Sequence, residues 1–552
     1  MKNQVFKVSQ AKRHHNLYFT IAYSSIVLAV CISVFTCFIS AFQYITFDIG
    51  PDPDQIRDAF VVMKMWEGEF PILGPASSVG NYSLPPLYYY LVFPFSLFGA
   101  DPIFQVLPNA IFAVLSVPLL SYLTYQLLDN IEQDRRLLLS GLAGLWYSLL
   151  FGVIFISTFQ WNPSSTPFFL TIFLLLLRFQ FQNTCSLNVQ ILSWALCGVI
   201  LSILVSLHSS NLFVIPAVFI LLSLVFVWRQ FRYRRFKQMG LPLVSIASSV
   251  IVLFPYWKGE FSRNFANSRA IIRLILESRS TTGVGNIFTR FSKIFWTYFD
   301  LGHQLYFPEP LALFFSISFI ALSLGSILSL WKFRGDRVLW GILWLLWGVY
   351  FYAASSFDRS SLIFYYKVLI LTMPILSIVV GLAYLNNTAI EKVFAAILVG
   401  SIFVSIGLNL YHDVKYLKAQ YGSQRLMTTR DTIEILKKIP DNATICDPRI
   451  ARNRQDINQY RYLSQYVLKK EIMVTSDCDR GRYVIHPKYI MGIHGHYQVN
   501  GNLTSFNSVP CQHYRWCSTS FWPQFTRLEN VKITREVDLV RETQTALIYQ
   551  IK

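Results

Sequence analysis

Long apolar stretches alternate with short polar ones over the first 410 residues, and this pattern predicts a helical membrane protein. A membrane-spanning helix needs about 20 mostly apolar residues, and eleven stretches approach that length. The fourth is short, and the break at "WNPSS" before it leaves open how the third and fourth divide. The eleven are Leu17–Ile45, Ile103–Leu128, Leu137–Phe155, Ser164–Leu177, Ile191–Leu207, Leu212–Trp228, Leu241–Tyr256, Leu311–Leu330, Val338–Ala354, Leu362–Leu385 and Val393–Leu410.

Positive charge predicts which side of the membrane each loop occupies, because Lys and Arg collect in cytoplasmic loops. The first 13 residues contain three Lys and one Arg, which places the N terminus in the cytoplasm. With eleven spans, the two most basic short loops, Trp228–Lys237 and Trp331–Arg337, also fall inside. We therefore predict a multi-pass plasma (inner) membrane protein whose C-terminal domain is extracytoplasmic. The first span is too long for a signal peptide and lacks a small-residue cleavage site.

The segments between and after the spans predict two domains. A transmembrane domain covers residues 1–410 and carries two outer loops, 46–102 and 257–310. The remainder, 411–552, is rich in polar residues and contains the strand patterns "ATICD", "EIMVTS", "RYVIHP" and "ALIYQI". Helical patterns precede and interrupt them. The sequence thus predicts a small α/β domain that packs on the outer face or helps to bind an acceptor.

Two local features of this predicted domain concern its helices and its cysteines. The stretch "TTRDTIEILKKIPDN" predicts a short helix with a capping pattern formed by Asp431 and Glu434. Four cysteines in an extracytoplasmic domain allow one or two disulfides in three alternative pairings. They are Cys446, Cys478, Cys511 and Cys517. The sequence contains no CxxC motif or His/Cys cluster that would predict zinc.

Composition agrees with a mainly α polytopic fold. The chain is 53% hydrophobic and only 14% charged, whereas soluble domains carry about 25% charged residues. The net charge of +18 partly reflects the basic inner loops. No basic run coincides with a nucleic-acid-binding motif, so we expect no nucleic-acid partner.

The first outer loop places several charges at the edge of the membrane. On a helix, Asp54, Arg57 and Asp58 of "GPDPDQIRDAF" share one face. An amphipathic helix on the outer surface, with carboxylates near its N terminus, would explain them by structure alone. The later stretch "LYYYLVFPFSLFG" predicts a second interfacial helix, with Tyr88 at headgroup depth.

The run "DQIRDAFVVMKMWEGEFPILGPASSVG…PPLYYYL…FGADP" resembles the first outer loop of the GT-C superfamily of integral-membrane glycosyltransferases. It is most similar to the branch that holds protein O-mannosyltransferases and the bacterial aminoarabinose transferase of lipid A. A weaker likeness continues through "QWNPSSTPFF", "LHSSNLFVIP" and "PYWKGEFSRNFANSRA", so that it spans about Asp48 to Ala270.

This resemblance implies transfer of a sugar from a polyprenyl-phosphate-linked donor, with inversion, on the outer membrane face. Asp54 matches the general base of the family. Arg57 would steady Asp54 or the donor phosphate, and Asp58 and Tyr88 would contribute to substrate binding. Two positions depart from the family. Its Asp-Glu pair is here Asp54-Gln55, and the lysine of the aminoarabinose enzyme's "KP" step is Leu84, so phosphate binding must come from elsewhere.

Later segments supply candidates for that role. Arg269 and Arg273 lie four residues apart on a predicted helix, as a phosphate clamp or as a basic face near anionic lipid. Glu260 is a candidate metal or acceptor ligand, or an interfacial residue. Lys367 lies within the outer half of a span, where an ionisable residue suggests function. His208 ends the fifth span and is a weaker candidate, because a lone histidine is more often structural.

Two other functions stay open. A transporter or flippase of lipid-linked glycans would favour paired charges or broken helices near the bilayer midplane, and the sequence indicates neither. The second alternative is a non-catalytic relative that binds polyprenyl phosphate, and the presence of Asp54 argues against it. Expected partners are the lipid-linked donor, membrane lipids and a lipid, glycan or protein acceptor. No cofactor is required by the sequence, and a divalent metal is left open.

Overall fold

The computed structural model covers the chain with gaps, and four predictions fall in those gaps. The predicted span Leu311–Leu330, Lys367, Cys511 and Cys517 lie outside the described residues. The described residues are 2–42, 54–77, 80–158, 160–182, 185–280, 288–289, 292, 335–356, 368–385, 388–421, 427–447, 456–475, 478–491, 496–499, 502–505, 507–509, 531–532, 536–544 and 546–551.

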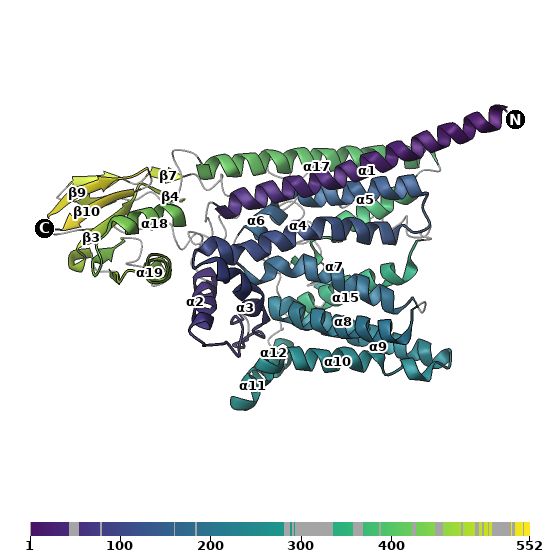
Figure 1. Ribbon diagram of the computed structural model, residues 1–552, viewed down its shortest axis with the longest axis horizontal. Helices are drawn as coiled ribbons and strands as arrows, with labels where there is room; N and C mark the ends of the chain where they lie inside the picture. Colours follow the sequence, from purple (N-terminus) through teal and green to yellow (C-terminus); the bar gives the residue numbers. More distant parts are fainter. Residues whose placement is uncertain are drawn as a thin grey trace.

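A bundle of long apolar helices forms the larger part of the molecule (Figure 1). Six helices in the described part of the chain are long and apolar enough to cross a membrane, and a bent pair would make a seventh. The chain is therefore a mainly helical, multi-pass membrane protein, as predicted. The six are α1 (Lys2–Phe42), α4 (Pro102–Leu127), α8 (Leu187–Leu207), α9 (Ser209–Arg232), α15 (Arg337–Ser356) and α17 (Ala389–Tyr421).

The third predicted span is wrong as a single helix. Instead, α5 (Gln133–Ser148) ends and the seven-residue α6 (Phe151–Ser157) follows after a break. The "WNPSS" motif then forms a 3-10 turn, η3 (Asn162–Ser165), that leads into α7 (Thr166–Gln180). The fourth predicted span is thus confirmed as short, with 15 residues.

The seventh predicted span, Leu241–Tyr256, is also not straight. It consists of α10 (Leu241–Val252), after the turn η4 (Phe236–Gln238), and α11 (Phe254–Ser262), with a bend of 65° at the break. Pro255 lies in the first turn of α11, where a missing backbone N–H is tolerated, and its ring disfavours a continuous helix through this point.

The described parts of the two predicted outer loops, which include 54–77, 80–102 and 257–280, lie at the end of the bundle that carries the C-terminal domain (Figure 1). The first loop contains α2 (Asp54–Trp66), α3 (Leu87–Val92) and the 3-10 turn η2 (Phe93–Phe98). The second contains α11 and α12 (Ala266–Ser280). The three parts predicted to be extracytoplasmic therefore share one side of the molecule.

The C-terminal domain is built on a five-stranded sheet of order β2-β1-β3-β10-β9. β1 pairs parallel with β2 and β3, and β10 runs antiparallel to β3 and β9. All four predicted strands are present in this sheet as β1, β2, β3 and β10, and its fifth strand, β9, was not predicted. The strands are β1 (Thr444–Cys446), β2 (Met473–Thr475), β3 (Tyr483–Pro487), β4 (Tyr489–Met491), β5 (His496–Val499), β6 (Asn502–Ser505), β7 (Asn507–Val509), β8 (Val531–Lys532), β9 (Val537–Glu542) and β10 (Ala546–Ile551).

Helices and helical turns complete this domain. They are α18 (Thr429–Lys438), α19 (Asp456–Tyr462), the π-helical turn η8 (Leu463–Leu468) and the 3-10 turn η9 (Cys478–Arg480). The bundle also contains the shorter helix α16 (Met373–Tyr384). The predicted domain boundary at residue 410 falls within α17, which continues to Tyr421.

The cap of α18 differs from the prediction. Thr428 is the N-cap, and its Oγ1 accepts a hydrogen bond from the backbone N–H of Asp431 at 3.2 Å. The Asp431 carboxylate accepts from the backbone N–H of Thr428 at 2.8 Å, which completes a capping box. The predicted pairing of Asp431 with Glu434 is wrong, because Glu434 instead pairs with Lys437.

Candidate functional site

The first turn of α2 holds an ion-pair cluster centred on Arg57. Its Nη1 lies 2.5 Å from Asp54 Oδ1, and its Nη2 lies 2.8 Å from Asp58 Oδ1. The side chain of Asp54 is 31% exposed, whereas that of Asp58 is fully buried. Arg57 thus joins one accessible carboxylate to one buried carboxylate, and the predicted shared face of these three residues is confirmed.

Asp58 is anchored from a second helix. The hydroxyl of Tyr89 on α3 donates to Asp58 Oδ1 at 2.9 Å, while Asp58 Oδ2 has no hydrogen-bond partner among the described residues. Burial raises the pKa of Asp58 to about 7, an effect that the adjacent Arg57 opposes. Because Asp58 is enclosed, its contacts in this structure serve to orient Arg57.

Tyr88 and Tyr89 pack inside the protein, so an interfacial location alone does not explain them. Their exposed fractions are 1% and 2%, and both lie on α3 beside the apolar side of α2. The hydroxyl of Tyr90 donates to the backbone oxygen of Pro71 at 3.1 Å. The aromatic run therefore fastens the two halves of the first outer loop to each other.

Three arginines of the second outer loop line a cavity of about 560 Å³. Arg269 and Arg273 project from α12, and Arg263 lies just before it. All three side chains are exposed, and none has an acidic partner in the part of the chain that the structure describes. The cavity therefore presents three uncompensated guanidinium groups, which suits an anionic ligand. Its remaining lining residues are Gly80, Asn81, Ala266, Ala270 and Leu274.

The first outer loop closes one wall of this arginine cavity. A hairpin turn, fixed by the bridge between Ala76 and Ser83, brings Gly80 against Leu274 of α12. Gly80 has a φ of +78°, and a Cβ atom there would lie 2.8 Å from Leu274 Cδ2. The backbone N–H of Ser83 also donates to Asn267 Oδ1 at 3.2 Å. The two outer loops are thus connected by direct contacts.

Glu260 fixes the start of α12. Its carboxylate accepts hydrogen bonds from the backbone N–H groups of Asn267 at 3.2 Å and Ser268 at 2.8 Å. The side chain is fully buried, so the interfacial interpretation of Glu260 does not fit. A carboxylate at a helix N terminus is favourable, and here it sets the direction in which Arg269 and Arg273 project.

An apolar groove of about 710 Å³ lies at the bend between α10 and α11. Its lining includes Ser262, the residue before Arg263 of the arginine cavity. This groove was not predicted from the sequence, although Pro255, near the end of an apolar run, is a signal for the bend at which it lies. Its lining residues are Val250, Phe254, Trp257, Lys258, Phe261 and Ser262.

Comparison with solved structures identifies the fold. ArnT from Cupriavidus metallidurans bound to undecaprenyl phosphate is similar over 95% of this chain and 97% of that one, with a TM-score of 0.51 and 10% identity. The chain has the GT-C fold. The oligosaccharyltransferase of Archaeoglobus fulgidus in complex with Zn and sulfate gives a TM-score of 0.43 at 11% identity, over 88% of this chain and 73% of that one. No protein-family model and no curated protein sequence matches this chain.

His208 and the motifs "WNPSS" and "LHSSNLFVIP" take structural positions in this GT-C bundle. His208 caps α9, with its Nδ1 accepting from the backbone N–H of Ser210 at 3.2 Å. Asn162 of the "WNPSS" turn donates to the backbone oxygen of Leu207, and Asn211 donates to that of Leu204 at 3.0 Å. The two motifs therefore meet and tie together the ends of neighbouring spans.

No metal centre is evident in the described part of the GT-C fold. Among the described residues, no group of three or more His, Cys, Asp or Glu side chains could hold a metal ion. Asp54 and Asp58 are both taken up by Arg57, and Glu260 is occupied by α12.

Proposed function

We propose that this chain is a glycosyltransferase that uses a polyprenyl-phosphate-linked sugar as donor and an alcohol as acceptor on the extracytoplasmic face of the membrane. One observation carries the proposal. An accessible carboxylate held by an arginine lies at the same end of the molecule as an arginine-lined cavity that adjoins an apolar groove. A base, a phosphate site and a site for a hydrocarbon chain are the parts that this reaction needs.

Asp54 is the proposed general base. As the acceptor hydroxyl attacks the anomeric carbon, its proton passes to the Asp54 carboxylate. The new bond joins the acceptor oxygen to the sugar, and the bond between the anomeric carbon and the phosphate oxygen breaks. The electron pair of that bond leaves with polyprenyl phosphate. A single displacement of this kind inverts the anomeric centre, and Arg57 holds the base in one orientation.

The arginine cavity is the proposed site of the donor phosphate. Arg269 and Arg273 offer guanidinium groups, which form strong charge-assisted hydrogen bonds to phosphate. The adjoining apolar groove suits the first isoprene units of the chain, and Lys258 also lines it. The ArnT structure, which was solved with undecaprenyl phosphate, supports a ligand of this class. Lys367 stays a predicted additional contact to the phosphate.

Mass spectrometry of cell-envelope glycans tests the proposal against its alternatives. We expect cells with Asp54→Asn to show the same missing sugar as cells without the protein. The matched control, Asp538→Asn, changes an exposed aspartate of β9 and should leave the glycans unchanged. If the deletion removes the sugar but Asp54→Asn retains it fully, a transporter or a non-catalytic lipid-binding protein is the better account.

A further inference from the structure

The C-terminal domain packs directly on the helix that carries Asp54. One buried apolar cluster contains Ile56, Ala59 and Met63 of α2 together with residues of α18, α19 and the central strands. α2 has only 13 residues, and isolated helices of this length are marginal in water. The position of α2, and with it that of Asp54, therefore depends on what packs against it.

Tyr462 is the side chain that joins most of these parts. It is 1% exposed, and its ring meets Phe60 of α2 edge to face at a centroid distance of 5.3 Å. Its hydroxyl donates to the backbone oxygen of Ala100 at 2.7 Å and accepts from Gln105 Nε2 at 2.9 Å. One residue of the tail thus bridges α2, the loop before α4 and α4 itself.

A rare element places a second tyrosine beside it. After Tyr462 the helix continues as the π-helical turn η8, and π-helical turns are frequent at functional sites. Tyr466 of this turn packs on Phe60 at 5.7 Å, and its hydroxyl donates to Glu67 Oε1 at 3.1 Å, just beyond the end of α2. The two tyrosines therefore hold α2 at its middle and just beyond its C-terminal end.

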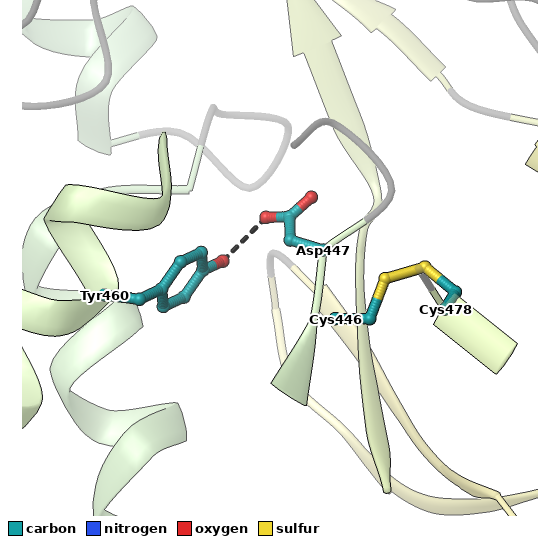
Figure 2. The surroundings of a disulfide bond; sticks show 4 residues. All are labelled: Cys446, Asp447, Tyr460 and Cys478. Carbon is teal, nitrogen blue, oxygen red and sulfur yellow. Dashed lines mark hydrogen bonds between the residues drawn. A yellow bond between two sulfur atoms is a disulfide. The ribbon is translucent and has the colours of Figure 1, made fainter. Parts of the chain in front are cut away.

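The same helix is tied to the disulfide of the sheet. Tyr460 of α19 donates a hydrogen bond to Asp447 Oδ2 at 2.6 Å, and both residues are fully buried. Asp447 directly follows Cys446, which is bonded to Cys478 (Figure 2). The disulfide thus fixes the end of β1 from which Asp447 reaches α19.

We propose that Tyr462 is a positioning residue, through which the C-terminal domain, braced by the Cys446–Cys478 disulfide, fixes α2 and so orients Asp54 for transfer. The role of Tyr462 in transfer rests on the proposed function, whereas its role in holding α2 does not. Asp58 and Tyr89 anchor α2 from α3, and the tyrosines of α19 and η8 anchor it from the tail.

Hydrogen exchange of the α2 amides, followed by mass spectrometry, tests whether Tyr462 and the disulfide hold α2 in place. Tyr462→Ala removes the ring and both hydrogen bonds, and we expect about tenfold faster exchange over residues 54–66. Tyr462→Phe keeps the ring and should partly restore protection. Tyr549→Phe, on β10 of the same domain, is the matched control and should leave α2 unchanged. Reduction of the wild-type disulfide should also speed exchange in α2, which keeps the test decisive should Tyr462→Ala not fold.

Binding of undecaprenyl phosphate separates positioning from general unfolding. If Tyr462 acts only through α2, the affinity of the arginine cavity for this probe stays within about twofold of wild type in Tyr462→Phe, because no residue that lines the cavity belongs to α2 or to the C-terminal domain. Unchanged α2 exchange in Tyr462→Ala and in the reduced protein would overturn the proposal. Faster α2 exchange in a protein without transferase activity would uphold the coupling and reject the proposed function alone.

Discussion

Asp54 and Asp58 are one turn apart and share the guanidinium of Arg57, yet their surroundings differ. Asp54 retains access to solvent, whereas Asp58 is enclosed by Arg57 and Tyr89. The sequence correctly placed the three charges on one face. It could not show that Asp58 is buried, because Tyr89 arrives from another helix 31 residues later. For the same reason, the tyrosines of "LYYYL" were predicted to lie at the membrane interface, whereas Tyr88 and Tyr89 are buried.

The raised pKa of Asp58 predicts a pH-dependent stability. Its folded value of about 7 lies above the value of about 3.9 expected in the unfolded chain. Between these values the unfolded chain binds fewer protons, so this group makes the fold less stable as pH rises, by up to about 1.4 kcal/mol per pH unit. Asp58→Asn should therefore gain in Tm relative to wild type as pH rises from about 4 to about 7.

Thermal unfolding of the detergent-solubilised protein, measured across this pH range, checks that prediction. Titratable groups other than Asp58 affect the Tm of both proteins in the same way, so the difference between the two Tm curves isolates the effect of Asp58. A curve for Asp58→Asn that stays parallel to that of wild type across this pH range would contradict the prediction.

At the scale of elements, apolar runs predicted where most helices lie but not where they break. One break separates α5 from α6. The other lies beside Pro255 at the start of α11, and the apolar groove is found at this bend. Four of the five strands in the main sheet of the C-terminal domain were predicted from sequence, and β9 was missed because every residue of it except Val537 is exposed and three of its six residues are charged. Contacts between loops, such as Ser83 to Asn267, leave no local pattern in the sequence.

The basic face of α12 predicts a loss of lipid-phosphate binding on substitution. Each charge-assisted hydrogen bond contributes about 1.5–3 kcal/mol, so Arg269→Ala should weaken binding of undecaprenyl phosphate about tenfold or more, and Arg273→Ala similarly. Titration of the purified protein with this lipid measures the effect. Arg232→Ala removes an exposed arginine that lies over Trp228 on α9 and should bind as wild type does. Equal affinity in all three variants would place the phosphate elsewhere.

Gly80 tests whether the first outer loop shapes this cavity. Gly80 and Gly68 both have positive φ, but only at Gly80 would a Cβ atom meet another residue, Leu274. Gly68→Ala should therefore cost only about 1 kcal/mol of backbone strain. Gly80→Ala should lower Tm further and also weaken undecaprenyl phosphate binding, because α12 must shift. If Gly68→Ala and Gly80→Ala change Tm and undecaprenyl phosphate binding equally, the contact between Gly80 and Leu274 does not shape the cavity.

At the scale of the whole molecule, two outer loops and a C-terminal domain gather at one end of a membrane bundle (Figure 1). The sequence predicted this grouping from the order of its spans and the positions of its basic loops. It did not predict that the tail would support α2, since the residues involved, such as Gln105 and Tyr462, are 357 positions apart. The GT-C fold thus brings together a carboxylate, an arginine cavity and a bracing domain from distant segments.

The central claim is that Asp54 removes the proton of an acceptor alcohol while polyprenyl phosphate departs. The most direct test is conversion of polyprenyl-phosphate-linked sugar to polyprenyl phosphate in membranes that contain this chain, followed by mass spectrometry of the lipid extract. A positioned base contributes about 10²–10⁴-fold to rate, so Asp54→Asn should lower the conversion by at least about 100-fold. Conversion by Asp54→Asn at the wild-type rate would contradict the account.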